Sequence, residues 1–537
     1  MTPPIERELK LNVSRDFHLP DVTTVPGLSM VTKPEKTLVA SYYDTDGLDL
    51  ARWGATLRYR SSGSSGEWTV KLDPPSTRDP AGASDPADEA ATTDRYEIEF
   101  EAGPGRVPRR ALELTSGLRR GRPLAVVAEL TTVRRAHLIL DPDGRQLAEM
   151  DDDTVEFRTM TDPPGRGVFR EIEVELLNPP LGAGGSDGNG SDGNGSDGGG
   201  EASGSDWTRS VYSLLSASGA ERNDGTPKLM RALGTVPPAL RASTGLAESA
   251  PVSELVSATL EASLHRLLRH EVGVRLGEDI EDVHQCRVAT RRLRADLRTF
   301  EGVLDPEPVL AVVERLQVLG AALGEVRDAD VLELRLRSLG PRLDPADGGE
   351  LESLIAVLHR ERSAAHARLI RRLGGADHGR LIDSLFELME KPPLRIPDQE
   401  AAGAARNLLA ERWASLAGAV GALSDRPADG QLHSIRKKAK RCRYAADMAT
   451  PLLGKRALRL SKGVAEVQDI LGEVQDASVA TEWLRRSARS GGQGRALVAG
   501  QLIGMEASRA EAARRDWSRA WKKTSHKGRV KWLAPSS

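Results

Sequence analysis

The chain has 537 residues, which is too long for one hydrophobic core, so at least two domains are expected. The composition, 39% hydrophobic and 28% charged, is that of a globular protein, and a net charge of −3 means that affinity for a polyanion must come from local clusters of cations. The two cysteines, Cys286 and Cys442, form neither a disulfide framework nor a zinc pattern. The sequence shows no signal peptide and no run of roughly 20 apolar residues. We therefore expect a cytoplasmic protein without a membrane span.

The first third of the chain has the pattern of short β-strands. Turn signals such as Asp141-Pro-Asp-Gly144 separate some of them, which favours an antiparallel meander or barrel. The expected strands are Ile5–Val13, Lys36–Tyr43, Ala55–Arg60, Glu67–Leu72, Arg95–Glu101, Leu124–Val133, Ala136–Leu140, Gln146–Asp151, Thr154–Thr159 and Val168–Leu176.

Two stretches interrupt this pattern. Residues 73–94 are rich in Pro, Asp, Ala and Ser and are predicted to form a flexible loop. Residues 182–206 contain a Ser-Asp-Gly-Asn-Gly repeat that cannot bury a core, so they are predicted to be a flexible insertion. A helix is expected over Trp207–Ser218.

The first strand carries an unusual triplet of charges. Residues i, i+2 and i+4 of a strand share one face, so Glu6, Glu8 and Lys10 project together. Two carboxylates and an ammonium group in a row suit a hard divalent cation and the phosphate that it neutralises. The alternative interpretation is a solvated strand face.

Other strands repeat this alternation of one apolar face and one charged face. Acids alternate through Glu97 and Glu99 and from Glu171 to Glu175, and Arg58 and Arg60 share a face. An antiparallel sheet with its outer face in water is one explanation. A closed barrel with a charged lumen accounts better for ionised groups of both signs, because metal-assisted phosphoanhydride hydrolysis needs carboxylates for the metal and cations for the phosphoryl oxygens.

These residues carry a family resemblance. The motifs Glu6-x-Glu8-x-Lys10, Tyr42-Tyr-Asp-Thr45, Leu57-Arg-x-Arg60, Trp68-Thr-Val-Lys71, Arg95-Tyr-Glu-x-Glu99, Ala148-x-x-Asp151, Glu171-Ile-Glu173 and Lys228 resemble, in order, those of the CYTH domain, the triphosphate tunnel metalloenzyme superfamily. The resemblance covers roughly residues 4–235 and implies an eight-stranded antiparallel tunnel that binds a triphosphate and Mg²⁺ or Mn²⁺. The domain is expected over residues 1–235.

The resemblance also implies a role for each matching residue. The metal ligands would be Glu6, Glu8, Asp151, Glu171 and Glu173. The triphosphate contacts would be Lys10, Arg58, Arg60, Lys71 and Lys228. Either Arg134 or Arg135 would be a further contact, since strand alternation allows only one of them to point inward. Asp153 stands where members of the family often have Gly.

From about residue 251 the pattern changes to helices with a period of 3.6 residues. The expected helices include Ser253–His270, Val309–Leu323, Gly349–Leu373 and Ala404–Leu423.

The sequence of this half also contains an internal repeat. The block 283–294 corresponds to 432–443, and about 40 residues after each His comes a second pair of related blocks, 323–329 and 471–477. Two shared blocks at matching spacing indicate a duplication, so a pseudo-symmetric all-helical bundle is predicted.

Each repeat contains one basic helical stripe. The residues His284, Arg287, Arg291 and Arg294 fall on one face, and so do His433, Arg436, Lys440 and Arg443. A solvated face is the plainer interpretation, but like charges repel along a helix, so a stripe present in both repeats favours a polyanion ligand. Interleaved aromatic residues are absent, so nucleic acid is not indicated.

The duplicated His-x-x-Arg pattern resembles the CHAD domain, the conserved histidine α-helical domain, expected over residues 248–523 and followed by a basic tail at 524–537. The resemblance implies a pair of four-helix bundles that bind inorganic polyphosphate. The two domains together resemble the bacterial inorganic triphosphatase arrangement. This implies metal-dependent hydrolysis of tripolyphosphate to pyrophosphate and phosphate. The alternatives are a nucleoside or thiamine triphosphatase and a non-catalytic polyphosphate-binding or targeting protein.

Overall fold

The computed structural model describes residues 5–63, 65–72, 93–177, 204–223, 226–234, 236, 246–247, 249–277, 279–424 and 427–533. The loop predicted at 73–94 and the insertion predicted at 182–206 lie mostly outside these residues. The chain divides into two compact units, residues 1–239 and 240–537. No helix within the described ranges is both long enough and apolar enough to cross a membrane.

The N-terminal unit is a closed antiparallel barrel, which confirms the predicted tunnel fold. Its strands follow one another around the barrel in the order β1, β6, β5, β4, β3, β7, β8 and β9, and β9 pairs again with β1. Two short strands, β2 (Ser29–Thr32) and β10 (Glu221–Arg222), pair with β7 and β1 from outside this ring. The bounds of the ring strands are β1 Ile5–Val13, β3 Lys36–Asp44, β4 Thr56–Ser62, β5 Ser65–Leu72, β6 Thr93–Phe100, β7 Ala125–Leu140, β8 Gln146–Thr159 and β9 Arg166–Leu176.

Two strands are longer than predicted. The expected pair Leu124–Val133 and Ala136–Leu140 is one continuous strand, β7, and the pair Gln146–Asp151 and Thr154–Thr159 is the single strand β8. The predicted breaks fell at Arg134-Arg135 and Asp152-Asp153. In the structure these residues pair across the two strands, Arg134 opposite Asp153 and Arg135 opposite Asp152.

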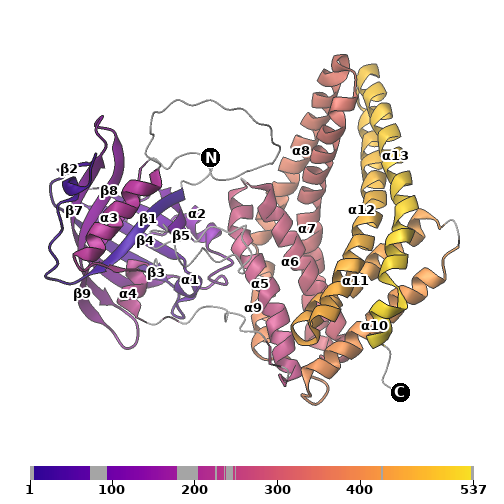
Figure 1. Ribbon diagram of the computed structural model, residues 1–537, viewed down its shortest axis with the longest axis horizontal. Coiled ribbons are helices and arrows are strands. Elements are labelled where there is room, and N and C mark those ends of the chain that lie inside the picture. The colour runs from indigo at the N-terminus through magenta and orange to yellow at the C-terminus, as the bar shows by residue number, and fades with distance from the viewer. Residues whose placement is uncertain are drawn as a thin grey trace. The chain divides into compact units, whose positions relative to one another are not determined.

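The apolar face of the barrel strands points outward and is covered by helices. Leu9, Leu11, Met150 and Ile172 pack with residues of α3 (Gly204–Ala217), which lies against the strands in Figure 1. The short helix α4 (Lys228–Leu233) packs Leu229 and Ala232 against a second group of barrel residues. The charged faces of the strands consequently point into the barrel, because alternate side chains of a strand lie on opposite faces.

The C-terminal unit is all-helical, as predicted. Its helices are α5 Val252–Leu276, α6 Ile280–Thr299, α7 Pro306–Leu339, α8 Gly348–Leu373, α9 Ala376–Glu390, α10 Ala401–Gly421, α11 Asp429–Leu453, α12 Lys455–Arg489, α13 Gln493–Thr524 and α14 Lys527–Val530. Leucine-rich faces of α7 and α8 form one core with α12 and α13, and Figure 1 shows these four long helices. The segment predicted as a tail at 524–537 begins at the last residue of α13.

Candidate active site and basic groove

The barrel encloses a cavity of about 260 Å³ whose wall is mostly charged. Because the barrel is closed, the inward faces of its strands converge on this one space. Among the predicted site residues, those that line the cavity are Glu8, Lys10, Arg58, Arg60, Lys71, Arg134, Asp151, Glu173 and Lys228. Glu6 lies on β1, opposite Arg95, but its side chain lies outside the described residues.

On one wall, two buried lysines neutralise the carboxylates. The Nζ atom of Lys10 lies 3.0 Å from Glu8 Oε1 and 2.9 Å from Glu173 Oε1. The Nζ atom of Lys228 lies 2.6 Å from Glu173 Oε2 and 2.8 Å from Glu171 Oε1. Burial opposes ionisation of Glu173, but Lys10, Lys228 and Arg134 outweigh it and hold its pKa well below the usual range. Cations and carboxylates therefore interleave here.

Arg134 is the arginine of the pair that points into the tunnel. It donates through Nε and Nη2 to the two carboxylate oxygens of Asp153, at 2.9 and 2.7 Å, and it also forms an ion pair with Asp151. Arg135 points outward, is 65% exposed and forms an ion pair with Glu35. Arg135 is thus excluded as a tunnel contact, because the alternation of β7 admits only its neighbour.

On the opposite wall, one carboxylate holds two of the predicted phosphate-binding cations. Glu97 Oε1 lies 3.5 Å from Arg58 Nη2, and Glu97 Oε2 lies 3.3 Å from Lys71 Nζ. Glu97 and Glu99 both line the cavity, and neither was predicted as a site residue. The signal was present in the sequence, since both acids alternate with apolar residues on β6.

Glu171 lies behind the cavity wall. Its side chain is fully buried and forms ion pairs with Lys228 and, at 2.5 Å, with Arg231 of α4, whose guanidinium group lies 4.0 Å from the centre of the Phe169 ring. The arrangement indicates that Glu171 positions Lys228. Arg231 was missed in the sequence, because a six-residue helix offers too short a pattern to reveal which of its residues face the site.

The carboxylates of the tunnel have the donor chemistry that a divalent cation requires. Asp151 Oδ1 is buried and accepts no hydrogen bond among the described residues. Burial, together with the nearby charges of Asp153, Glu173 and Glu149, raises the pKa of Asp151 to about 7, despite the opposing charge of Arg134. A cation would relieve both conditions. Within the described ranges no three Asp, Glu, His or Cys residues are grouped so as to hold a metal ion. Lys10, Arg134 and Lys228 pair with the carboxylates instead.

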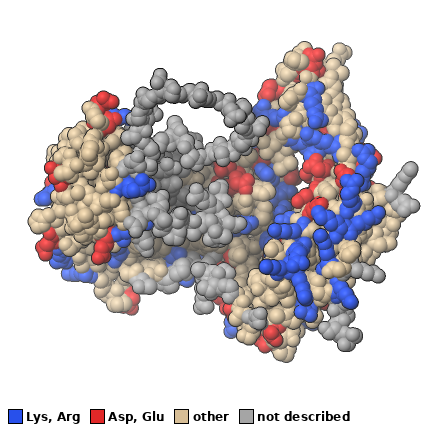
Figure 2. Space-filling view, viewed as in Figure 1, with Lys and Arg blue, Asp and Glu red and all other residues tan. Residues whose placement is uncertain are grey.

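In the C-terminal unit, cations from the two repeats meet between α6 and α11. Burial and the nearby charges of Arg291, Arg436 and Arg287 lower the pKa of Lys440 to about 7. Arg291 donates from Nε to the hydroxyl of Tyr444 on α11, at 2.7 Å. We call the cluster of Arg287, Arg291, Arg436 and Lys440 the basic groove. Figure 2 shows Lys and Arg side chains gathered on the face of this unit seen there.

The second pair of repeated blocks provides the surface against which Arg287 and Arg436 pack. Gly324 of α7 lies so close to Arg287 that an added Cβ would come within 2.8 Å of its Nη1, and Gly472 of α12 lies beside Arg436 in the same way, at 3.5 Å. Arg287 also forms an ion pair of 2.9 Å with Asp328. The repeated Leu-Gly-Glu-Val segment thus places a glycine against the His-x-x-Arg helix in both repeats.

The other four predicted stripe residues have different surroundings. Burial and nearby cations lower the pKa values of His284 and His433, which favours the neutral form of both imidazoles. Arg443 lies 3.9 Å from Asp447. Burial and the nearby charges of Arg298 and Arg441 lower the pKa of Arg294.

Comparison with known families agrees with this architecture. Residues 4–182 match the family model of the CYTH domain, and residues 258–485 match that of the CHAD domain. The chain is a CYTH–CHAD domain protein and, through its N-terminal unit, a member of the triphosphate tunnel superfamily. Members of that superfamily are typically triphosphatases or cyclases and generally depend on a divalent metal.

A relative from Mycobacterium tuberculosis aligns with almost the whole chain. The uncharacterized protein Rv2226 is 28% identical over 540 residues, which cover 96% of each chain. Among solved structures, PptA from Streptomyces chartreusis aligns with 51% of this chain and all of its own, with a TM-score of 0.42 at 23% identity. The CHAD domain from the plant Ricinus communis aligns with 56% of this chain and 98% of its own, with a TM-score of 0.43 at 27% identity.

Proposed function

We propose that the protein hydrolyses inorganic tripolyphosphate to pyrophosphate and phosphate in its tunnel and binds polyphosphate with its helical unit. The observation that carries the first part is the single cavity that six cations and several carboxylates line together. Phosphoryl transfer requires little covalent chemistry from a protein, so positioning and charge stabilisation account for most of the catalysis.

The cations of the tunnel would hold the substrate. Arg58, Lys71 and Arg60 come from neighbouring strands of one wall, and Lys10, Arg134 and Lys228 approach from the other side. Each cation is now paired with a carboxylate, so a triphosphate would replace the carboxylates as the partner of these cations. Arg134 would grip two phosphoryl oxygens at once, as its fork does with Asp153.

The carboxylates released in this way would hold the metal. Glu8, Asp151 and Glu173 face the cavity and fit Mg²⁺ or Mn²⁺, with Glu6 as a further proposed ligand on the same strand as Glu8. Glu171, which the family resemblance implies as a further ligand, lies behind Lys228, and we propose that it positions that lysine. When bound, the metal would neutralise the phosphoryl oxygens and lower the pKa of the attacking water.

The lining of the cavity favours an inorganic substrate. Among its described lining residues, Tyr42 is the one aromatic side chain, and the remainder is mostly charged or small. A base or a thiamine ring would need an apolar or aromatic surface for stacking. This supports tripolyphosphate over a nucleoside or thiamine triphosphate.

A substrate panel tests the proposal. The full-length protein, with Mg²⁺ or Mn²⁺, is given tripolyphosphate, ATP, thiamine triphosphate or pyrophosphate, and phosphate release is measured. Tripolyphosphate should be cleaved fastest and pyrophosphate poorly, because the cations grip three phosphoryl groups. Excess EDTA should abolish the activity, since the carboxylates then have only the substrate-binding cations as partners. Unchanged phosphate release in EDTA would overturn the metal-dependent mechanism.

A further inference from the structure

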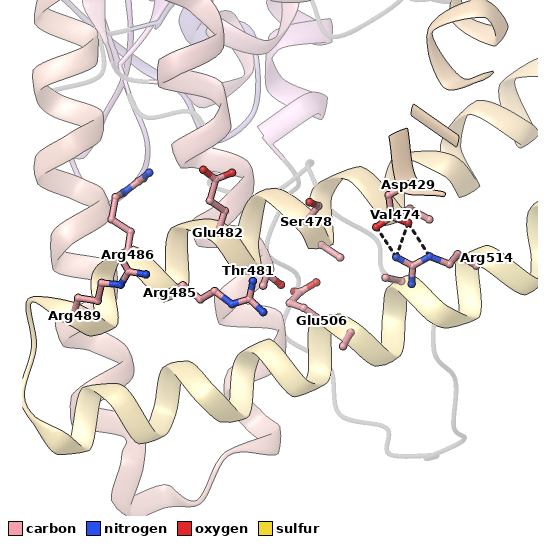
Figure 3. A pocket seen from close by; sticks show the side chains of 13 residues that line it. Asp429, Val474, Ser478, Thr481, Glu482, Arg485, Arg486, Arg489, Glu506 and Arg514 are labelled. Atoms are coloured by element: carbon pink, nitrogen blue, oxygen red, sulfur yellow. Dashed lines mark hydrogen bonds and ion pairs between the residues drawn. The ribbon is translucent and has the colours of Figure 1, made fainter. Parts of the chain in front are cut away.

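A further cavity of the helical unit extends along α12, from Val474, close to the basic groove, to Arg489 at the end of the helix. It has a volume of about 710 Å³ and is lined mainly by the second half of α12 and by α13. Figure 3 shows Arg485 extending into it beside Thr481, with Arg486 and Arg489 toward the end of α12. Arg485 lies 13 residues beyond Gly472, or about 20 Å along the helix at 1.5 Å per residue.

The duplication supplies an internal comparison for this cavity. Aligning the two Leu-Gly-Glu-Val segments places Glu333 opposite Thr481 and Arg337 opposite Arg485. In the first repeat, Arg337 Nε lies 3.0 Å from Glu333 and its Nη1 lies 3.0 Å from Glu352. In the second repeat a threonine replaces the partner one turn before the arginine. The second repeat thus has the arginine without the carboxylate that pairs with it in the first repeat.

A second ion pair is missing in the same way. Asp330 of the first repeat holds Arg362 and lines the corresponding cavity, of about 460 Å³. The residue aligned with Asp330 is Ser478, which lines the larger cavity together with Ala507 and Ala510. Among the residues that the structure describes, Arg485, Arg486 and Arg489 have neither an ion-pair nor a hydrogen-bond partner. At these two positions the second repeat has hydroxyl side chains where the first repeat has carboxylates, and the guanidinium groups nearby have no partner in the described part of the chain.

The acids around the cavity do not neutralise these arginines. Glu506 accepts hydrogen bonds from Arg335, with Nη2 at 2.6 Å. Asp429 holds Arg514 at 2.8 Å, the interaction drawn in Figure 3. Glu482 is exposed and forms no ion pair with the three arginines. An anion in the cavity would therefore meet cations that lack a partner and acids of which two are already paired.

We propose that this cavity between α12 and α13 is a second anion site, which binds the phosphoryl oxygens of a small phosphate compound. The fork of Arg485 would bind two oxygens, and the hydroxyl groups of Ser478 and Thr481 would donate to the same anion. Arg489 lies one turn further along α12 and would contact a second phosphoryl group. The anion comes either as free pyrophosphate or as the end of a longer polyphosphate chain. The proposal does not depend on hydrolysis in the tunnel.

The decisive variant restores the carboxylate of the first repeat. Thr481→Glu places an acid four residues before Arg485, the favourable order for an ion pair on a helix, so the arginine is kept but occupied. Hydrogen–deuterium exchange of the full-length protein, in EDTA, then reports which peptides pyrophosphate or long polyphosphate protects. We expect protection of residues 478–489 in the parent, and at least about tenfold weaker binding there in T481E and in R485A.

Two control variants separate a site from a general charge effect. Leu458→Glu adds the same charge to an exposed position near the start of α12, 23 residues from Thr481, and should bind like the parent. Arg337→Ala removes the aligned, already paired arginine and should also leave the protection of 478–489 intact. Protection by pyrophosphate identifies a free anion as the ligand, and protection by long chains alone identifies a chain end. No protection with either, or equal weakening in L458E and T481E, would overturn the proposal.

Discussion

At the scale of single residues, the neighbouring arginines of β7 provide a matched test of the tunnel. Arg134 is mostly buried among carboxylates and lines the cavity, whereas Arg135 is largely exposed. We expect Arg134→Ala to lower tripolyphosphate turnover by about 100- to 1,000-fold, the usual cost of losing a preorganised charge donor. Arg135→Ala should retain the parental rate. The measurement is phosphate release under saturating metal.

Loss of Arg134 also leaves Asp151 and Asp153 with fewer cationic partners, so part of the effect could come from lower stability. Arg134→Lys separates the two causes, because it keeps the charge but cannot bind two oxygens in a fork. This variant should melt close to the parent and still turn over more slowly. If R134A and R135A are equally active, the β7 cation has no role in the reaction.

A second residue-scale prediction concerns Lys440, whose pKa is lowered to about 7 by burial and by Arg291, Arg436 and Arg287. The lysine is charged below this pH and neutral above it, so polyphosphate affinity should fall as the pH rises from 6 to 8.5. We expect a decrease of about tenfold, the value of one charged hydrogen bond. Because folding lowers this pKa from 10.5, the free energy of unfolding should also rise between about pH 7 and 10.5.

Lys440→Arg is the control for this pH effect, since an arginine stays charged throughout and stands at the equivalent position, Arg291, in the first repeat. Its affinity should change much less over the same range. Burial and neighbouring cations also lower the pKa values of His284 and His433, and Lys440→Arg retains both histidines, so the comparison isolates the contribution of Lys440. Fluorescence anisotropy with labelled polyphosphate reports the affinities. Parallel profiles for the two proteins would exclude Lys440 as the titrating group.

At the scale of elements, alternation along strands predicted most of the barrel. It placed the first strand at Ile5–Val13 and identified the charged faces that line the tunnel. It left Arg134 and Arg135 as alternatives. The two-residue period of a strand shows which residues share a face, but it does not show which face points inward. It split β7 and β8 at charged pairs, Arg134-Arg135 and Asp152-Asp153, which face one another across the two strands in the structure. Only the closed barrel provides those partners.

The repeated helix pairs yield an element-scale prediction. At Gly324 a Cβ would lie 2.8 Å from Arg287 Nη1, whereas at Gly472 the nearest Arg436 atom is 3.5 Å away. Alanine at either position should stabilise its helix by up to about 1 kcal/mol. Gly324→Ala should nevertheless displace Arg287 and weaken polyphosphate binding several-fold, while Gly472→Ala should bind like the parent. Calorimetric titration measures the polyphosphate affinity of both variants. Equal affinities would show that the position of Arg287 against Gly324 does not matter for binding.

At the scale of the whole molecule, the sequence indicated a division of labour that each unit's contents support. Every proposed metal ligand and Lys228 lie in the unit of residues 1–239, and the basic groove lies entirely in the unit of residues 240–537. The convergence of α6 and α11 was beyond sequence analysis, since a helical period identifies a face but not the helix that it meets. The structure thus brings two stripes, 149 residues apart along the chain, into one groove.

The two units should therefore separate in function. A fragment of residues 1–239 should fold and hydrolyse tripolyphosphate with metal, because its barrel closes without any residue of the second unit. A fragment of residues 240–537 should be inactive but retain polyphosphate in a pull-down. Its binding should weaken steeply between 50 and 200 mM salt, because it releases counterions from a polyanion.

The full chain then tests whether the groove serves binding alone. A variant with alanine at the stripe residues should lose polyphosphate retention but keep its tripolyphosphatase activity, since none of them belongs to the tunnel. Retention equal to that of the parent would refute the groove, and loss of hydrolysis would refute the division between the units. The residues to replace are His284, Arg287, Arg291, Arg294, His433, Arg436, Lys440 and Arg443. Circular dichroism and the melting temperature test whether unfolding contributes, because the substitutions relieve repulsion among the cations but also remove the ion pair of Arg287 with Asp328 and the hydrogen bond of Arg291 to Tyr444.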